Sequence, residues 1–172
     1  KKQVDESLLK IEDFMNQKFG SESNPLLVSV RSGARQSMPG MMETVLNVGL
    51  TSKTLPGLIK QSGDERFVYD AYRRLITMYS DVVMEKAQGL NPKSEKGIRE
   101  QLEVILDNYK LTHNYLEDTD LTAQDLKAIV NLFKDCIYNV FGESFPDDEK
   151  DQLWGAITAV FKSWNGKRAK TY

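Results

Sequence analysis

Apolar residues recur at steps of three or four along most of this chain, which is the spacing of an α-helix that buries one face. The first such stretch lies between Val4 and Phe19, and Gly20 after it suits the position just beyond a helix. The stretch predicts an N-terminal helix of about four turns. Its apolar positions are Val4, Leu8, Ile11, Met15 and Phe19.

A short strand is predicted after this helix. Asn24-Pro25 is a turn signal, and residues 26–30 form a compact apolar run that is partly β-branched, which is typical of a buried strand. The chain then enters a loop rich in small residues. Beyond the loop, the segment from Met41 to Val48 is predicted to begin a short helix that Gly49 closes.

Helices are predicted for the rest of the chain, because beyond Thr51 the β-branched residues are scattered at helical spacing among good helix formers. A short helix is expected over 55–61, with Pro56 in its first turn. Asp64 is expected to cap a long helix that Gly89 and Pro92 interrupt. The expected apolar face of the long helix holds Phe67, Ala71, Leu75, Met78 and Val82, widened by Tyr72, Ile76, Tyr79 and Val83.

Three more helices follow in this pattern. Ser94 is expected to cap the first, and Thr122 the second, with Asp125 at the capping-box position. Gly142 is expected to end the second, and the third follows Phe145-Pro146. Their apolar stripes are Ile98, Leu102, Ile105, Leu106 and Tyr109; Leu126, Ile129, Val130, Phe133, Ile137, Val140 and Phe141; and Leu153, Ile157, Val160, Phe161 and Trp164.

These elements predict a mostly α protein of α+β character. The 172 residues carry a formal net charge of −2, so no basic surplus indicates nucleic acid as a partner. No apolar run approaches the roughly 20 residues of a membrane span, and the first residues do not resemble a signal peptide. Cys136 is the only cysteine, which excludes an internal disulfide and suits a reducing compartment, so we expect the cytoplasm.

The loop after the predicted strand carries the candidate chemistry. Arg31 stands at the strand's exit, and Gly33 and Gly40 let the backbone approach a ligand closely. A fixed guanidinium charge together with backbone N–H groups suits an anion such as phosphate. An ordinary surface loop has a similar composition, and its methionines would fill irregular apolar gaps. Composition alone leaves both interpretations open.

A resemblance favours the first interpretation. Residues 27–34 (LVSVRSGA) and 37–47 (SMPGMMETVLN) resemble the nucleotide-binding domain of pyruvate, phosphate dikinase. Residues 67–75, 118–122 and 159–164 resemble later segments of that domain, in the same order. The resemblance implies an internal fragment of an ATP-grasp-type domain that a helical subdomain interrupts. It implies a partial ATP-grasp lobe with a phosphate-binding loop over 1–50, a helical subdomain over 51–145, and a helix returning to the first lobe over 146–172.

The resemblance also implies a function for the parent enzyme. It would use ATP and Mg²⁺ to phosphorylate a histidine of its own central domain, on the way from pyruvate and phosphate to phosphoenolpyruvate, AMP and diphosphate. The parent is expected to be a homodimer. Arg31 is the first expected contact of the ATP phosphates. Weaker expected contacts, as backbone or hydroxyl donors in a lid over the phosphates, are Ser32, Gly33, Ser37, Gly40 and Thr44, with Arg35 after them.

Within this chain we expect neither catalytic residues nor metal ligands. The resemblance places the phosphorylated histidine in another domain, so His113 is interpreted as a partly exposed histidine near a helix end. The family's lysine-bearing glycine-rich segment and its acidic metal ligands match nothing here, so the fragment alone is expected to be inactive. Structural roles are also expected for the remaining candidates: capping for Asp118, Asp120 and residues 147–149, solvated or ion-paired positions for Arg73 and Arg74, and packing for Cys136, Trp154 and Trp164.

A second hypothesis comes from a different class. The chain would be a helical protein-interaction module without a catalytic role, whose loop only resembles the nucleotide-binding one. An exposed apolar patch of more than a few hundred Å² on the helical part would favour this hypothesis.

Overall fold

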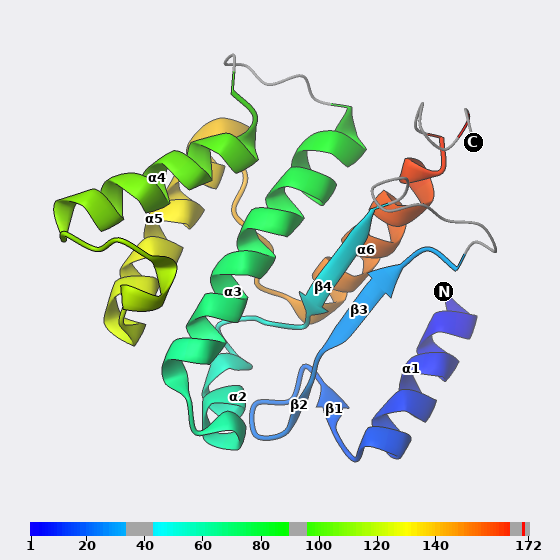
Figure 1. Cartoon of the computed structure of the whole chain (residues 1–172). Helices are drawn as coiled ribbons and strands as arrows, with labels where there is room; N and C mark the ends of the chain where they lie inside the picture. Colours follow the sequence, from blue (N-terminus) through cyan, green and yellow to red (C-terminus); the bar gives the residue numbers. More distant parts are fainter. Residues whose placement is uncertain (34–42, 90–95, 166–169, 171–172) are drawn as a thin grey trace.

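The computed structural model describes residues 1–33, 43–89, 96–165 and 170 (Figure 1). The described strands form two small two-stranded sheets. One helix lies across a face of the longer sheet, and a group of helices lies beside one of its strands. The described elements are α1 (Lys2–Met15), β1 (Lys18–Phe19), β2 (Pro25–Leu26), β3 (Val28–Arg31), β4 (Thr44–Val48), α2 (Leu55–Ser62), α3 (Glu65–Tyr79), the π-helix η1 (Ser80–Glu85), the 3-10 helix η2 (Lys86–Gln88), α4 (Ile98–Thr112), the 3-10 helix η3 (Asp118–Asp120), α5 (Ala123–Phe141) and α6 (Glu149–Ser163).

The first helix is shorter than predicted. It ends at Met15 because Asn16 adopts a left-handed backbone with φ 50°, a conformation that asparagine tolerates. Phe19, expected on the helix, lies instead in β1, and its N–H donates to Glu12 Oε1 at 2.9 Å. β1 pairs in parallel with β2. The helical spacing of Phe19 therefore did not indicate a helical backbone.

The helix predicted over Met41 to Val48 is wrong for its described part, because Thr44–Val48 is the strand β4. β4 pairs antiparallel with β3, and Val45 and Val48 are fully buried. Three of its five residues are β-branched, and the partner strand and the burial of Val45 and Val48 favour an extended backbone. Gly49 follows the strand with φ +108°, where an added Cβ would lie 3.1 Å from the Leu26 carbonyl oxygen.

Two local predictions for the long helix have opposite outcomes. Asp64 caps α3 as predicted, since its carboxylate accepts from the N–H of Phe67 at 2.8 Å. Phe67, predicted on the apolar face, is 62% exposed, and the neighbouring Val68 is buried in its place. The buried face is thus rotated by one residue at the start of the helix.

The later helices follow the predicted stripes closely. Thr122 and Asp125 form the predicted capping box of α5, and Gly142 ends that helix with φ 73°. The predicted cap Ser94 lies outside the described residues, and the residue that precedes α4 is Gly97. The predicted α6 stripe is wrong at its end, where Phe161 is 60% exposed and Trp164, which directly follows the helix, is 45% exposed.

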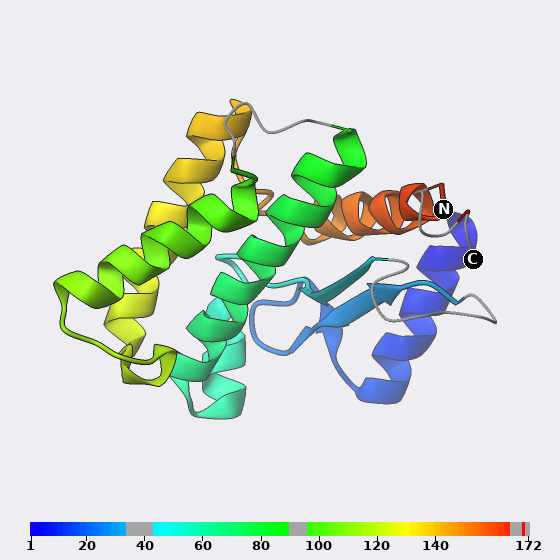
Figure 2. The same cartoon turned by 45° about the horizontal axis from the view of Figure 1, so that its top comes forward.

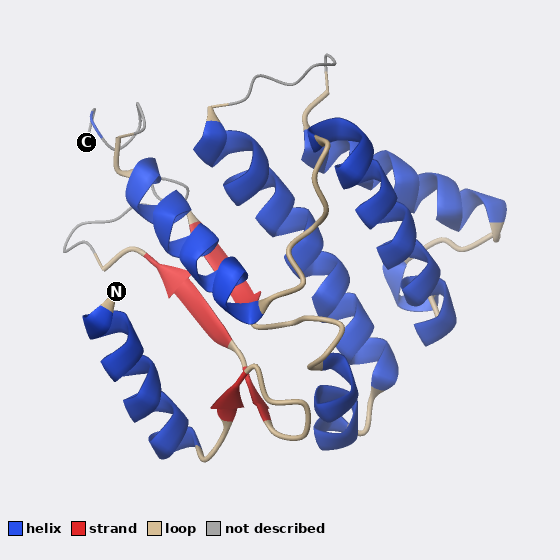
Figure 3. Cartoon of the chain, turned by 180° about the vertical axis from the view of Figure 1, so that it is seen from behind, coloured by secondary structure: helices blue, strands red, loops and turns tan. Residues whose placement is uncertain are grey.

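The core joins the sheet to the helices. α3 packs against α5 and β4, and α4 packs against α5 (Figure 2). Figure 3 shows α6 across the β3–β4 hairpin, and α6 contacts both strands. Phe145 meets the rings of Tyr72 and Tyr79 edge-on, with centroids 6.3 and 5.5 Å apart. The predicted class, mostly α with α+β character, is confirmed by a mostly helical structure with small sheets, and the division at residues 50 and 145 stays a prediction.

None of the described helices is long and apolar enough to cross a lipid bilayer.

Candidate functional site

The β3–β4 hairpin brings four of the predicted site residues to one end of the sheet. Arg31, the last residue of β3, faces Thr44, the first residue of β4, in the antiparallel ladder. Ser32 and Gly33 follow Arg31 directly. The predicted residues Ser37 and Gly40, and Arg35 with them, lie outside the described residues. The described part of the predicted site is therefore assembled at the hairpin's end.

The strand's alternation sets the direction of Arg31. Val28 and Val30 are half-buried, whereas Ser29 and Arg31 are exposed, as the two-residue period of a strand requires. Thr44 is half-buried opposite Arg31. The guanidinium therefore stands on the solvent side of the hairpin, where a ligand can reach it.

Arg31 differs in its charge environment from the other arginines in the described ranges. No side chain of the described residues forms an ion pair or hydrogen bond with its guanidinium. The other four are engaged: Arg66 donates to the carbonyls of Leu121 and Asp118, Arg73 and Arg74 bind Asp70, and Arg99 binds Asp81. Arg31 is thus the one arginine of the described parts whose charge remains available to an anion.

The structure does not require glycine at position 33, where the sequence predicted a close backbone approach to a ligand. The Gly33 backbone does not lie in the left-handed region, and an added Cβ would meet no atom within 4 Å. The structure therefore provides no steric reason for glycine at this position. Ser32 is half-buried and already makes an interaction, so it is a weaker donor candidate than Thr44.

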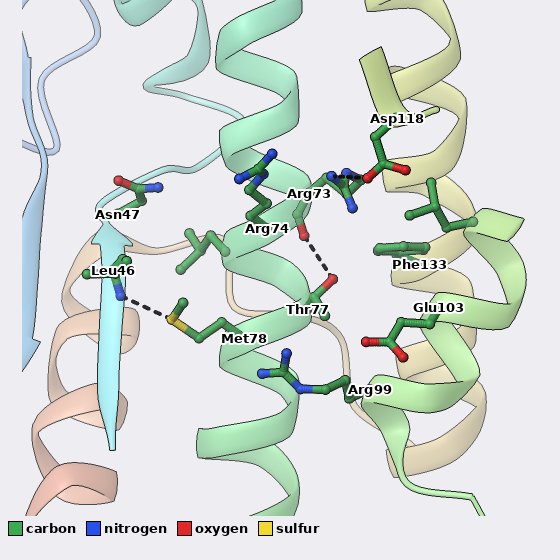
Figure 4. A pocket seen from close by; sticks show the side chains of 12 residues that line it. Leu46, Asn47, Arg73, Arg74, Thr77, Met78, Arg99, Glu103, Asp118 and Phe133 are labelled. Atoms are coloured by element: carbon green, nitrogen blue, oxygen red, sulfur yellow. Dashed lines mark hydrogen bonds and ion pairs between the residues drawn. The ribbon is translucent and has the colours of Figure 1, made fainter. Parts of the chain in front are cut away.

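A second arginine-rich site was not predicted from the sequence. A cavity of about 510 Å³ lies between β4, α3 and α4, and Arg73, Arg74 and Arg99 line it (Figure 4). The ion pairing expected of Arg73 and Arg74 is confirmed. The sequence did not predict that Arg73 is buried, yet its side chain is only 9% exposed. The doubled arginine is the only sequence signal for this cavity.

Carboxylates neutralise the charge of this cavity. Arg73 binds Asp70 at 2.7 Å and Asp118 at 3.2 Å, and Asp118 also accepts from Lys110 at 2.8 Å. The hydrogen bond from Lys110 is the main reason that the pKa of Asp118 lies below its ordinary value, and the charge of Arg73 adds to it. Internal pairs thus occupy these guanidinium groups, in contrast to Arg31.

The structure assigns local roles to the remaining candidates. His113 directly follows α4, where its Nδ1 lies 2.9 Å from the Tyr109 carbonyl oxygen and its ring stacks on Tyr109 and Tyr115. Asp120 accepts from the N–H groups of Leu116 and Glu117. Among the residues that the structure describes, no three acidic, histidine or cysteine side chains form a group able to hold a metal ion.

Two further candidates also have structural surroundings. Asp148 caps α6 by accepting from the N–H groups of Lys150 and Asp151, both at 2.9 Å. Cys136 is half-buried beside the core, and this burial raises the pKa of its thiol. A raised pKa keeps the thiol protonated and disfavours reactivity.

Comparison with known proteins identifies one family over the whole chain. The sequence profile described as pyruvate phosphate dikinase, AMP/ATP-binding domain, matches residues 1–172. The chain is 49% identical over 172 residues to pyruvate, phosphate dikinase of Clostridium symbiosum and 44% identical over 172 residues to that of Rhizobium meliloti. It is 46% identical over 170 residues to the chloroplastic pyruvate, phosphate dikinase 1 of Oryza sativa subsp. japonica.

The matches are complete for this chain and partial for its relatives. They cover 99%, 100% and 99% of this chain but 18%, 18% and 17% of the three relatives. The chain therefore spans less than a fifth of the length of these curated proteins.

Proposed function

The chain belongs to the pyruvate phosphate dikinase family, in the region of its AMP/ATP-binding domain, and we propose that Arg31 binds the polyphosphate of ATP in the complete enzyme. The observation that supports this role is the outward-facing guanidinium at the end of β3, which no side chain of the described residues pairs. Arginine suits it because its charge is permanent and its planar donors match phosphate oxygens two at a time.

The neighbouring groups fit the same ligand. Thr44, the ladder partner of Arg31, carries a hydroxyl group. Gly33, two residues after Arg31 in the chain, supplies a backbone N–H. Neutral donors beside a fixed cation favour an anion over a neutral ligand. Under this proposal the chain's own residues bind and orient the phosphates, which is the main protein contribution to phosphoryl transfer.

The parent reaction is part of the proposal. The enzyme would use ATP as the source of phosphoryl groups for a histidine of its central domain, and then for phosphate and pyruvate. His113 lies in a stack of tyrosines at the end of α4, so it is not the proposed acceptor. Mg²⁺ would be held by ligands elsewhere in the enzyme, because the described residues contain no suitable cluster. The chain by itself would then be inactive.

Nucleotide titration of the full-length enzyme containing this chain tests the role of Arg31. With Arg31→Ala we expect the Kd for ATP to rise about 10- to 100-fold, the effect of losing charge-assisted hydrogen bonds. The Kd for AMP should change much less, because AMP lacks the β- and γ-phosphates. Arg31→Lys should fall between wild type and Arg31→Ala, since it keeps the charge and loses the planar fork.

An exposed lysine on another element, the helix α1, supplies the control. Lys10 is exposed on α1, and Lys10→Ala should leave ATP affinity unchanged. Wild-type ATP affinity in Arg31→Ala would overturn the proposal, and equal losses for ATP and AMP would locate the contact outside the polyphosphate. We expect the 172-residue chain alone neither to hydrolyse ATP nor to bind it tightly. Calorimetry tests the binding, because micromolar ATP affinity would contradict the need for the missing segments.

A further inference from the structure

Two contacts from distant elements hold the residue before β4. The backbone N–H of Glu43 donates to Ser163 Oγ at the end of α6, at 3.3 Å. The Glu43 carboxylate lies 3.7 Å from Lys86 Nζ of η2. The next residue, Thr44, is the ladder partner of Arg31. These contacts therefore act at the end of the hairpin where Arg31 lies.

The π-helix places Lys86 beside Asp81, five residues earlier in the chain. The backbone N–H of Lys86 donates to the carbonyls of Asp81 and Val82, and its Nζ lies 3.0 Å from Asp81 Oδ2. In an α-helix, side chains five residues apart point about 140° away from one another. The wider π-turn brings them to the same side of the helix, and π-turns occur frequently at functional sites.

Asp81 holds Lys86 in place. Its side chain is only 6% exposed, and a buried carboxylate is costly unless cations pair with it. Arg99 of α4 supplies the second cation, with its Nε 2.9 Å from the same Oδ2 atom. Glu43, Lys86, Asp81 and Arg99 thus form an ion-pair relay from the start of β4, through the end of the long helix, to α4. Arg99 also lines the cavity of Figure 4.

A separate hydrogen bond links α6 to η2, next to Lys86. Lys162 Nζ of α6 donates to the Ala87 carbonyl at 2.8 Å, so α6 is attached to η2 beside Lys86. Ser163, the next residue of α6, is the one that accepts from Glu43. The start of β4, η2 and the end of α6 are therefore linked pairwise.

We propose that Lys86 is a positioning residue, which holds Glu43 and through it the Arg31–Thr44 pair at the place where Arg31 takes the polyphosphate. This inference rests on the proposed function of Arg31. Lys86 does not bind the ligand itself, because two carboxylates already surround its ammonium group. The Lys86–Glu43 pair is partly exposed, and such pairs contribute little to overall stability. Its effect is therefore expected on ligand geometry, where small misplacements are costly.

The test is nucleotide titration of the full-length enzyme with variants at both ends of the pair. With Lys86→Met we expect the Kd for ATP to rise about two- to fivefold, with little change for AMP. Lys86→Arg should restore most of the affinity. Glu43→Gln should have the same effect as Lys86→Met, and the double variant should be no weaker than either single variant, because both remove one interaction.

Lys127→Met is the matched control. Lys127 of α5 also pairs with a glutamate, Glu65, at 2.6 Å, but this pair lies at the start of α3, away from the end of the hairpin where β3 ends, so its loss should leave ATP affinity unchanged. Additive losses for Lys86→Met and Glu43→Gln, or equal losses of ATP and AMP affinity, would overturn the positioning role. If Lys86→Met does not fold, Glu43→Gln alone decides, and its wild-type ATP affinity would overturn the inference.

The two proposals fail in different ways. Suppose that Arg31→Ala binds ATP more weakly while Lys86→Met and Glu43→Gln bind it as wild type does. This result would overturn only the positioning role. Wild-type ATP binding by Arg31→Ala would overturn the proposed function and the inference that rests on it.

Discussion

Arg31 and Thr44 face each other as the last residue of β3 and the first residue of β4. Arg31 makes no ion pair with any described side chain, so its guanidinium contributes little to folding. We expect Arg31→Ala to change the free energy of unfolding by less than about 0.5 kcal/mol, as exposed substitutions usually do. Urea denaturation measures this, and a larger loss would indicate a structural role for Arg31.

Arg73 should behave in the opposite way. Its side chain is 9% exposed and binds the carboxylates of Asp70 and Asp118. Arg73→Ala leaves the partly buried Asp70 without this cation, and we expect a loss of about 2–4 kcal/mol in unfolding free energy. The same denaturation experiment compares the two arginines. Equal stability of Arg31→Ala and Arg73→Ala would contradict the difference between an exposed arginine and one that two carboxylates bind.

The capping carboxylate of α5 predicts a pH dependence. Burial raises the pKa of Asp125, but hydrogen bonds from Thr122, Tyr109 and Tyr115 outweigh it and lower the pKa from 3.8 to about 2. A lowered carboxyl pKa stabilises the folded state above the unfolded value. This contribution should be complete above about pH 4 and lost as the pH falls toward about 2.

Asp125→Asn isolates this contribution. We expect the variant to be less stable than wild type near pH 7, and the difference to shrink as the pH falls below about 4, because the wild-type carboxylate is then protonated as well. Thermal unfolding between pH 2 and 7 measures the difference. A constant difference across this range would show that ionisation of Asp125 does not stabilise the fold.

Gly155 of α6 marks a close approach of two helices. An added Cβ would lie 2.1 Å from Tyr79 Oη, at the end of a rigid ring, and 3.2 Å from Val83 Cγ1. We expect Gly155→Ala to destabilise the protein by about 1–3 kcal/mol through overpacking. Tyr79→Phe removes the closest atom, so the double variant Tyr79→Phe/Gly155→Ala should recover part of the loss. Strictly additive effects in thermal unfolding would contradict this contact.

Two lysines of α5 predict different titration behaviour. Lys134 Nζ lies 5.0 Å from the ring centroid of Tyr72, and burial lowers its pKa although Asp147 opposes the shift. Lys127 Nζ lies 5.1 Å from the Tyr69 centroid, and its hydrogen bond to Glu65 raises its pKa. After reductive methylation with a ¹³C label, the NMR resonance of Lys134 should therefore titrate at the lower pH. A reversed order would contradict the opposite effects of burial on Lys134 and of the Glu65 hydrogen bond on Lys127.

The helices were largely predictable from the sequence. The cap at Asp64 and the capping box of Thr122 and Asp125 were found because such signals lie within three residues of the bonds that they form. The apolar stripe from Leu126 to Ile137 was found because helical spacing repeats within a few turns. The place of Arg31 at the end of a strand was also predicted, whereas the alternating burial that directs its side chain outward was not, because the sequence had indicated a buried strand.

The strand β4, the burial of Arg73 and the relay through Lys86 depended on tertiary contacts. Thr44–Val48 extends because β3 is its partner, and Arg73 is buried because Asp118 comes from a distant segment to pair with it. Lys86 pairs with both Glu43 and Asp81 at the end of a π-turn that no sequence pattern indicated. Sequence by itself determined most of the helices with their caps, and the family, because spacing and caps act over a few residues. Only the tertiary structure decided which charges are paired and which remain available, because partners far apart in the chain must first be brought together.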